Sequence, residues 1–167
     1  MKAFKKWTAL WLFLSVCFGV SAQKGLHIDS IFRDYGKREG STLIELAKDV
    51  LGNHTKINRY KSLIAVSDSL MFERTRQAVK ADFIDHGSYG NRVIFKESLK
   101  DGQLVDAAYC LGKAKESADY EYILFSVKKQ QMTLIYLRGK FPPLQLYNEL
   151  EQLKNLFIEV NNKRIKL

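Results

Sequence analysis

The sequence predicts an α+β fold, a largely antiparallel sheet with a four-strand C-terminal meander packed against two to four helices. Two observations lead to this prediction. Apolar residues recur at helical spacing near both ends of residues 23–167 and again between positions 70 and 85. Four apolar runs with short polar connections follow one another between positions 92 and 141, as in consecutive antiparallel strands. Helices that cover such a sheet complete an α+β domain.

Residues 1–22 have the organisation of an export signal. Three lysines precede an apolar run from Trp7 to Val20, and small residues then allow cleavage after Ala22. The run is shorter than the ~20 residues that span a bilayer, and no second long apolar segment follows. We therefore expect an exported protein of the periplasm or cell envelope. Its mature chain, residues 23–167, should form a single α+β domain that does not cross a membrane.

The domain is predicted to begin with a short helix. Ile28, Ile31, Phe32 and Tyr35 fall at helical spacing and make one apolar stripe. Gly36 can end this helix, because glycine is common just after a helix C-terminus.

Residues 41–46 allow two alternatives. Thr42 and Glu45 fit a capping box, in which each side chain bonds the free backbone amide near the other, and Gly52 could then end a helix. The competing interpretation is a short strand at 41–46 that leads into one or two helical turns. The residues alone leave both open.

A strand and a long helix are expected next. Residues 57–66 (INRYKSLIAV) are rich in apolar residues and lack glycine and proline, which predicts a strand. Ser67, Asp68 and Ser69 can cap a helix over residues 70–85. Its apolar stripe comprises Leu70, Phe72, Val79, Phe83 and Ile84.

Four strands and a final helix complete the expected order. The strands are predicted at residues 92–99, 103–111, 120–127 and 132–141. Asp101 and Gly102 give a hairpin turn between the first two strands, and the polar run 128–131 joins the last two. Pro143 can start an amphipathic helix that we expect to reach Val160, before a frayed basic tail.

Asp82, Asp85 and His86 are weak candidates for a metal site. Their i, i+3 and i+4 spacing could bring them together on a helix. The helix dipole also favours a histidine cation in a last turn, which explains His86 without a metal. Gly36 and Gly40 lack the spacing of a phosphate-binding loop. The prediction is therefore no metal and no cofactor.

The charge pattern does not indicate nucleic-acid binding. The chain has a formal net charge of +9, from 27 basic and 18 acidic residues. Nucleic-acid-binding surfaces gather their basic residues on one face with aromatic residues between them, whereas here they are spread along the chain. We predict no nucleic-acid partner and interpret most of this charge as a solvated surface.

Cysteine usage predicts a domain without an internal disulfide. After cleavage only Cys110 remains, within the strand-like run VDAAYCLG. A reactive thiol needs an accessible, electropositive setting, and nothing in the sequence indicates one. We expect Cys110 to be a buried, inert thiol.

The leading functional prediction is an exported, non-catalytic binding or interaction module whose partner is an unknown envelope protein or glycan. Tyr109, Tyr120, Tyr122 and Tyr136 lie in predicted strands and would offer a binding face. A homodimer that hides this face against itself is a further expectation. The alternative is an envelope hydrolase that uses an acidic residue with His86.

The mature chain resembles a family of small exported proteins of unknown function from Bacteroides-type bacteria. The resemblance lies in IFRDYGKREGSTLIELAKDVLG (31–52), in YKSLIAV (60–66), in YILFSVKKQQMTLIYLRGKF (122–141) and in the closing Leu-rich helix. It implies export and an α+β domain, and it favours the strand at 41–46. It implies no activity and no active-site residues.

Ser30 and Ser69 are candidate glycosylation sites. The triplets DSI (29–31) and DSL (68–70) resemble the acceptor motif for O-glycosylation of exported proteins in the Bacteroides group. Helix caps need the same residue types at the same places, so capping is the alternative explanation.

Overall fold

The structure is a computed structural model. It describes residues 25–53, 55–66, 68–86, 92–114 and 117–155, and the backbone alone of residues 157–160 and 163–166. The expected signal peptide and its cleavage after Ala22 lie outside the described residues.

The described elements alternate helices with strands in the first half and then form a run of strands. In chain order they are α2 (His27–Tyr35), β1 (Ser41–Ala47), α3 (Lys48–Leu51), β2 (Ile57–Val66), α4 (Ser69–Asp85), β3 (Val93–Lys100), β4 (Gln103–Lys113), β5 (Tyr120–Lys128), β6 (Gln131–Gly139), the 3-10 helix η1 (Pro143–Gln145), α5 (Leu146–Lys154), β7 (Phe157–Val160) and β8 (Lys163–Lys166).

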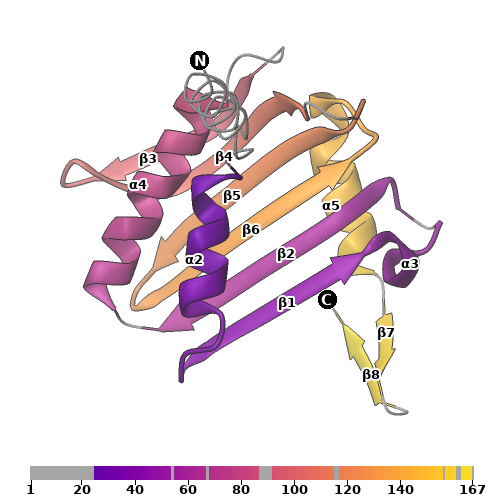
Figure 1. The fold of residues 1–167 in the computed structure, drawn as a ribbon, viewed down its shortest axis with the longest axis horizontal. Coiled ribbons are helices and arrows are strands. Elements are labelled where there is room, and N and C mark those ends of the chain that lie inside the picture. Colours follow the sequence, from indigo (N-terminus) through magenta and orange to yellow (C-terminus); the bar gives the residue numbers. More distant parts are fainter. Residues whose placement is uncertain are drawn as a thin grey trace, which may run out of the picture.

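Six strands form one antiparallel sheet in the order β1-β2-β6-β5-β4-β3, and β7 pairs with β8 in a separate hairpin. The predicted C-terminal meander is confirmed, because β3, β4, β5 and β6 are successive neighbours. β2 adds to the free side of β6, so β1 and β3 are the two edges of the sheet (Figure 1). The α+β fold class is therefore as predicted.

Helices cover both faces of the sheet. α2 and α4 lie on one face, and α5 lies behind the other (Figure 1). Ile31, Phe32 and Val79 belong to the core between the first face and its helices, whereas Leu146 and Leu153 belong to the core on the α5 side. A central strand of this sheet is thus buried on both faces.

The stretch 41–46 is a strand, as the resemblance favoured, and the capped-helix alternative is wrong. β1 pairs with β2 through seven consecutive residues, from Ser41 opposite Ala65 to Ala47 opposite Arg59. This pairing satisfies the backbone groups that face β2 along the whole segment, which a capping box would do only for one turn. The side chain of Thr42, the proposed cap, is exposed in β1.

Two glycines make the joint between α2 and β1. A Cβ on Gly36 would lie 2.5 Å from the Phe32 carbonyl oxygen and 2.6 Å from a Leu43 methyl carbon, so only glycine fits without a shift. Gly40 has a φ of +76°, a left-handed conformation that glycine adopts without steric cost. The chain can therefore reverse sharply from α2 into the sheet.

α4 begins where the sequence predicted, and Phe72 and Val79 of its predicted stripe are buried, but Leu70 and Ile84 are not. Asp68 caps it by accepting a hydrogen bond from the Met71 amide at 3.1 Å. Its buried residues are Met71, Phe72, Thr75, Ala78, Val79 and Asp82. Leu70 and Ile84 are instead 66% and 67% exposed, because they lie on the helix side away from the sheet.

The predicted hairpin turns are confirmed. Asp101 and Gly102 both have positive φ and connect β3 to β4 in the two-residue turn that matches strand twist. Lys129 also has positive φ, and the pairing of Lys128 with Gln131 makes the β5–β6 connection equally tight.

The C-terminal prediction is wrong beyond residue 154. α5 ends at Lys154, and Phe157–Val160 pairs as a strand with Lys163–Lys166. The helix expected to reach Val160 is therefore cut short, and part of the expected frayed tail is a strand. Aromatic and β-branched residues at 157–160 favour extended structure, and here that preference prevails over the helical spacing.

Over the part of the chain that the structure describes, no helix is both long enough and apolar enough to cross a membrane.

Candidate functional site

Asp82 caps a helix other than its own. α2 has no local side-chain cap, yet the amides of His27 and Ile28 donate to the two carboxylate oxygens of Asp82 at 2.6 and 3.0 Å. The first amides of a helix have no hydrogen-bond partner within that helix, so Asp82 supplies the acceptors here. A negative charge is also favourable at a helix N-terminus. Asp82 is 2% exposed, so this contact fastens α2 to α4 from within the core.

Burial dominates the ionisation of Asp82. It raises the pKa of this carboxyl to about 6, although the two amide hydrogen bonds and the nearby His27 and His86 act to lower it. Asp82 is thus a structural carboxylate that titrates well above the usual range for an aspartate.

The weak metal candidates do not converge. Asp82 binds the start of α2, and Asp85 lies 3.3 Å from the imidazole Nε2 of His27. His86 contacts Glu121 of β5 instead. Among the described residues, no group of three or more histidine, cysteine, aspartate or glutamate side chains could hold a metal ion.

His86 belongs to a buried network with Glu121 and Tyr136. The Nε2 atom of His86 lies 2.7 Å from one Glu121 carboxylate oxygen, and the Tyr136 hydroxyl donates to the other at 2.5 Å. Burial alone would raise the pKa of Glu121, but these hydrogen bonds and the charges of His86 and Arg138 hold it below its usual value. The Tyr136 pKa is raised by burial and by the Glu121 charge.

A second polar group adjoins this network. Arg138, which faces Glu121 across β5 and β6, donates from Nε to Asp119 at 3.3 Å and from its terminal nitrogen to Ser117 at 2.9 Å. Asn58 donates to the same Asp119 oxygen at 3.1 Å. The other Asp119 oxygen is buried without a hydrogen-bond partner in the described structure.

The sequence did not reveal the contact between His86 and Glu121. Glu121 and His86 are 35 residues apart, so no local spacing relates them. The signal that could have found Glu121 is its place as a charged residue inside the apolar run YEYILFSV, because a charged side chain in a buried strand needs a partner.

The tyrosine face predicted from the sequence is not formed. Tyr109, Tyr122 and Tyr136 are 1%, 0% and 5% exposed, and only Tyr120 is half-buried. Their hydroxyls are used internally: Tyr109 donates to Glu97, and Tyr122 donates to a backbone carbonyl at 2.6 Å. The prediction was wrong for these three residues because helices cover both faces of the sheet.

The two candidate glycosylation serines lie in first helical turns. The Ser30 hydroxyl donates to the His27 carbonyl oxygen at 2.7 Å. Ser69 is exposed at the start of α4, next to the capping residue Asp68. The cap alternative thus holds for Asp68, while attachment of glycan to either serine stays a prediction.

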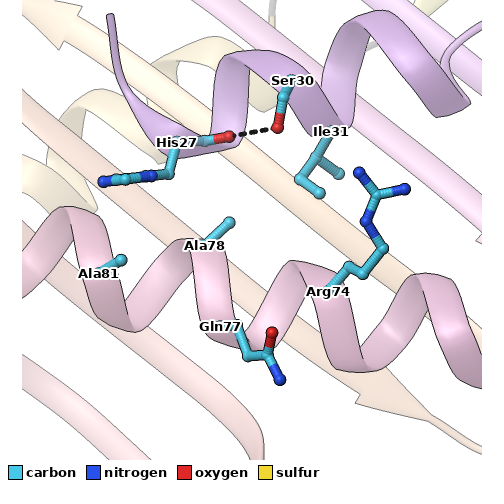
Figure 2. A pocket seen from close by; sticks show the side chains of 7 residues that line it. All are labelled: His27, Ser30, Ile31, Arg74, Gln77, Ala78 and Ala81. Atoms are coloured by element: carbon cyan, nitrogen blue, oxygen red, sulfur yellow. Dashed lines mark hydrogen bonds between the residues drawn. The ribbon is translucent and has the colours of Figure 1, made fainter. Parts of the chain in front are cut away.

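A shallow groove runs between α2 and α4, with a volume of about 240 Å³. His27 and Ser30 of α2 face Ala78 and Ala81 of α4 (Figure 2), whose short side chains leave the space open. The remaining lining residues are Ile31, Arg74 and Gln77. Arg74 donates to the Tyr35 hydroxyl at 2.9 Å, so its charge helps to join the helices.

The two edges of the sheet differ in regularity. β1 pairs with β2 without any register shift, and Leu43 and Ile44 on its two faces are half-buried. β3 has register shifts between Ile94 and Lys96 and between Ser98 and Leu99. Bulges and lysines protect an edge strand from further pairing, so β1 is the edge better suited to accept another strand.

Comparison with known proteins places the chain in a family. The family described as "Family of unknown function (DUF6108)" matches residues 15–150, so the chain belongs to it. No curated protein and no solved structure matches the chain significantly.

Proposed function

We propose that this protein is an exported, non-catalytic module of the periplasm or cell envelope that binds an extended segment of a partner protein along β1. The observation that carries this proposal is the geometry of β1, an edge strand with seven consecutive, unshifted pairs. Such an edge offers backbone groups to an added strand, while side chains on alternate sides supply specificity.

The side chains of β1 suit an added strand. Leu43 packs against the core under α2, and Ile44 packs against the core on the α5 side, yet both keep part of their surface in solvent. An arriving strand would cover apolar surface on both faces at once. Glu45 is the one charged residue of β1, and Lys61 at 3.1 Å already balances it.

Export is supported by the order of residues 1–22, a basic start followed by an apolar run and small residues. The test is the N-terminus of the protein recovered from its native cells. A chain that begins at Gln23 agrees with the proposal, and a chain that retains its lysine-rich start in the cytoplasm contradicts it.

Partner binding is tested by hydrogen exchange on the protein captured from native envelopes. Binding should slow exchange of β1 amides, and Thr42→Lys should weaken capture because it adds a charge to an exposed position of that edge. Leu99→Lys on β3, also exposed, is the matched control and should capture as well as wild type. Equal loss in both variants, or protection confined to other elements, would argue against β1.

A second candidate function is an envelope hydrolase, and the 2.7 Å contact between His86 and Glu121 is what favours it. A carboxylate that orients a histidine is a common arrangement for general base catalysis. The test is hydrolysis of simple aryl esters by purified protein, with the folded Glu121→Gln variant as control. Turnover that the variant loses supports this candidate, and a rate equal to buffer alone rejects it.

A further inference from the structure

We propose that the strand that adds to β1 is β1 of a second copy of this chain, so that two sheets join across a two-fold axis. This inference rests on the proposed function, because it names the partner of the same edge. A symmetric dimer needs a surface that is complementary to itself. The sequence and register of β1 can be tested for that property.

The two faces of β1 are defined by its pairing. Because its register is unshifted, residues alternate strictly, and Ser41, Leu43 and Glu45 share the α2 face. Thr42 and Ile44 lie on the α5 face. A two-fold axis perpendicular to the sheet keeps each face on its own side, so opposed residues must come from the same set.

One register satisfies this condition with favourable contacts over residues 41–45. Centring the axis on Leu43 places Leu43 opposite its own copy and Thr42 opposite Ile44. It also places Ser41 opposite Glu45, where the hydroxyl can donate to the carboxylate. A register centred on Ile44 would instead oppose Leu43 to Glu45. One centred on Glu45 would oppose two like charges.

The other edge lacks this self-complementarity. On β3, Ile94 and Leu99 lie on the same face, because they pair with Tyr109 and Leu104 of one core cluster. If Ile94 paired with Leu99 of a second copy, the register shift after Ile94 would place Glu97 opposite Glu97 of that copy. A like-charge pair at the axis is destabilising, so β3 should remain unpaired.

The test combines cross-linking with oligomeric state in the mature protein. Leu43→Cys should form a disulfide-linked dimer under mild oxidation, because opposed strand residues bring their Cα atoms within disulfide range. Leu99→Cys is the control at the other edge and should stay unlinked. Light scattering of the unmodified protein should show a concentration-dependent dimer, with a dissociation constant on the order of micromolar for so small an interface.

Charge exchange tests the register. Ser41→Lys should tighten the dimer about three- to tenfold by facing Glu45 of the other copy, and Ser41→Glu should weaken it by a similar factor. In a Glu45→Lys background the order of these two effects should reverse. Circular dichroism verifies that each variant keeps the wild-type fold, including Glu45→Lys, which removes the 3.1 Å ion pair with Lys61.

The outcomes separate this inference from the proposed function. If the protein is a monomer at every concentration and Leu43→Cys forms no cross-link, the proposal that a second copy adds to β1 is overturned. If that monomer still captures an envelope protein and this binding slows hydrogen exchange in β1, the proposed function stands without the dimer. If the dimer instead cross-links through Leu99→Cys, it pairs through the other edge of the sheet, and the β1 pairing is overturned. A dimer that is lost on deletion of residues 156–167 depends on the C-terminal segment and also overturns the β1 pairing.

Discussion

Buried carboxylates connect distant parts of this chain. Asp82 holds the first turn of α2, and Glu121 joins β5 to His86 at the end of α4. Glu149 on α5, 3% exposed, accepts from the Thr55 hydroxyl and the Lys56 amide, both at 3.0 Å. Each carboxylate has two or more donors, which offsets the cost of removing its charge from water.

Removal of the Tyr136 hydroxyl should be more costly than removal of the Tyr109 hydroxyl. Both tyrosines donate to a glutamate, but Glu121 is buried and would lose a donor that water cannot replace, whereas Glu97 is exposed. Tyr136→Phe should lower the free energy of unfolding by about 1–3 kcal/mol and Tyr109→Phe by less than about 1 kcal/mol. Urea denaturation measures both, and equal losses would contradict the expected role of burial.

Asp82 should make stability depend on pH. Its pKa is about 6 in the folded protein against 3.8 for an ordinary aspartate, so the folded state binds more protons between these values. Stability from this residue is therefore fully present below about pH 3.8 and is lost as the pH rises through 6, by roughly 3 kcal/mol.

Asp82→Asn provides the measurement, since asparagine cannot titrate. The difference in unfolding free energy between wild type and variant should change across pH 4 to 6 and stay flat above pH 7. Subtracting the two curves cancels the contribution of Glu121, whose lowered pKa acts in the opposite sense. A difference that is constant over this range would show that Asp82 does not titrate there.

At the scale of elements, the turns and the meander of β3 to β6 were predictable because their signals are local. The Asp101–Gly102 turn identified a hairpin directly, and the meander followed from it. Contacts between distant segments were not predictable: nothing near Asp82 in sequence indicates that it caps α2. The buried tyrosines were misassigned for the same reason, because the spacing of residues in a strand does not show that helices cover both faces of the sheet.

The joint between α2 and β1 should tolerate alanine unequally at its two glycines. Gly36→Ala places a Cβ against the Phe32 carbonyl and Leu43, so the entry of β1 must shift. Gly40→Ala meets open space but keeps an unfavourable positive φ, which costs about 1 kcal/mol. Thermal unfolding should show the larger loss for Gly36→Ala, and a reversed order would mean that the joint relaxes around residue 36.

At the scale of the whole molecule, the helices on both faces make the sheet interior inaccessible, and Cys110 can report on it. This residue is fully buried in β4, forms no disulfide among the described residues, and has its pKa raised by burial. Its thiol should therefore react with a labelling reagent only when the structure opens.

Among the described strands, only β3 lies beyond β4 on its side of the sheet, so two kinds of opening can be distinguished. If the sheet unfolds as one unit, the free energy from labelling rates equals that from urea denaturation. If β3 detaches alone, the free energy from labelling rates is smaller than that from urea denaturation. In that case Leu99→Lys on β3 accelerates labelling and leaves the free energy from urea denaturation unchanged. We expect the first result, because Tyr109 beside Cys110 stacks on Phe83 of α4 at 4.5 Å and ties β4 to the helical layer independently of β3.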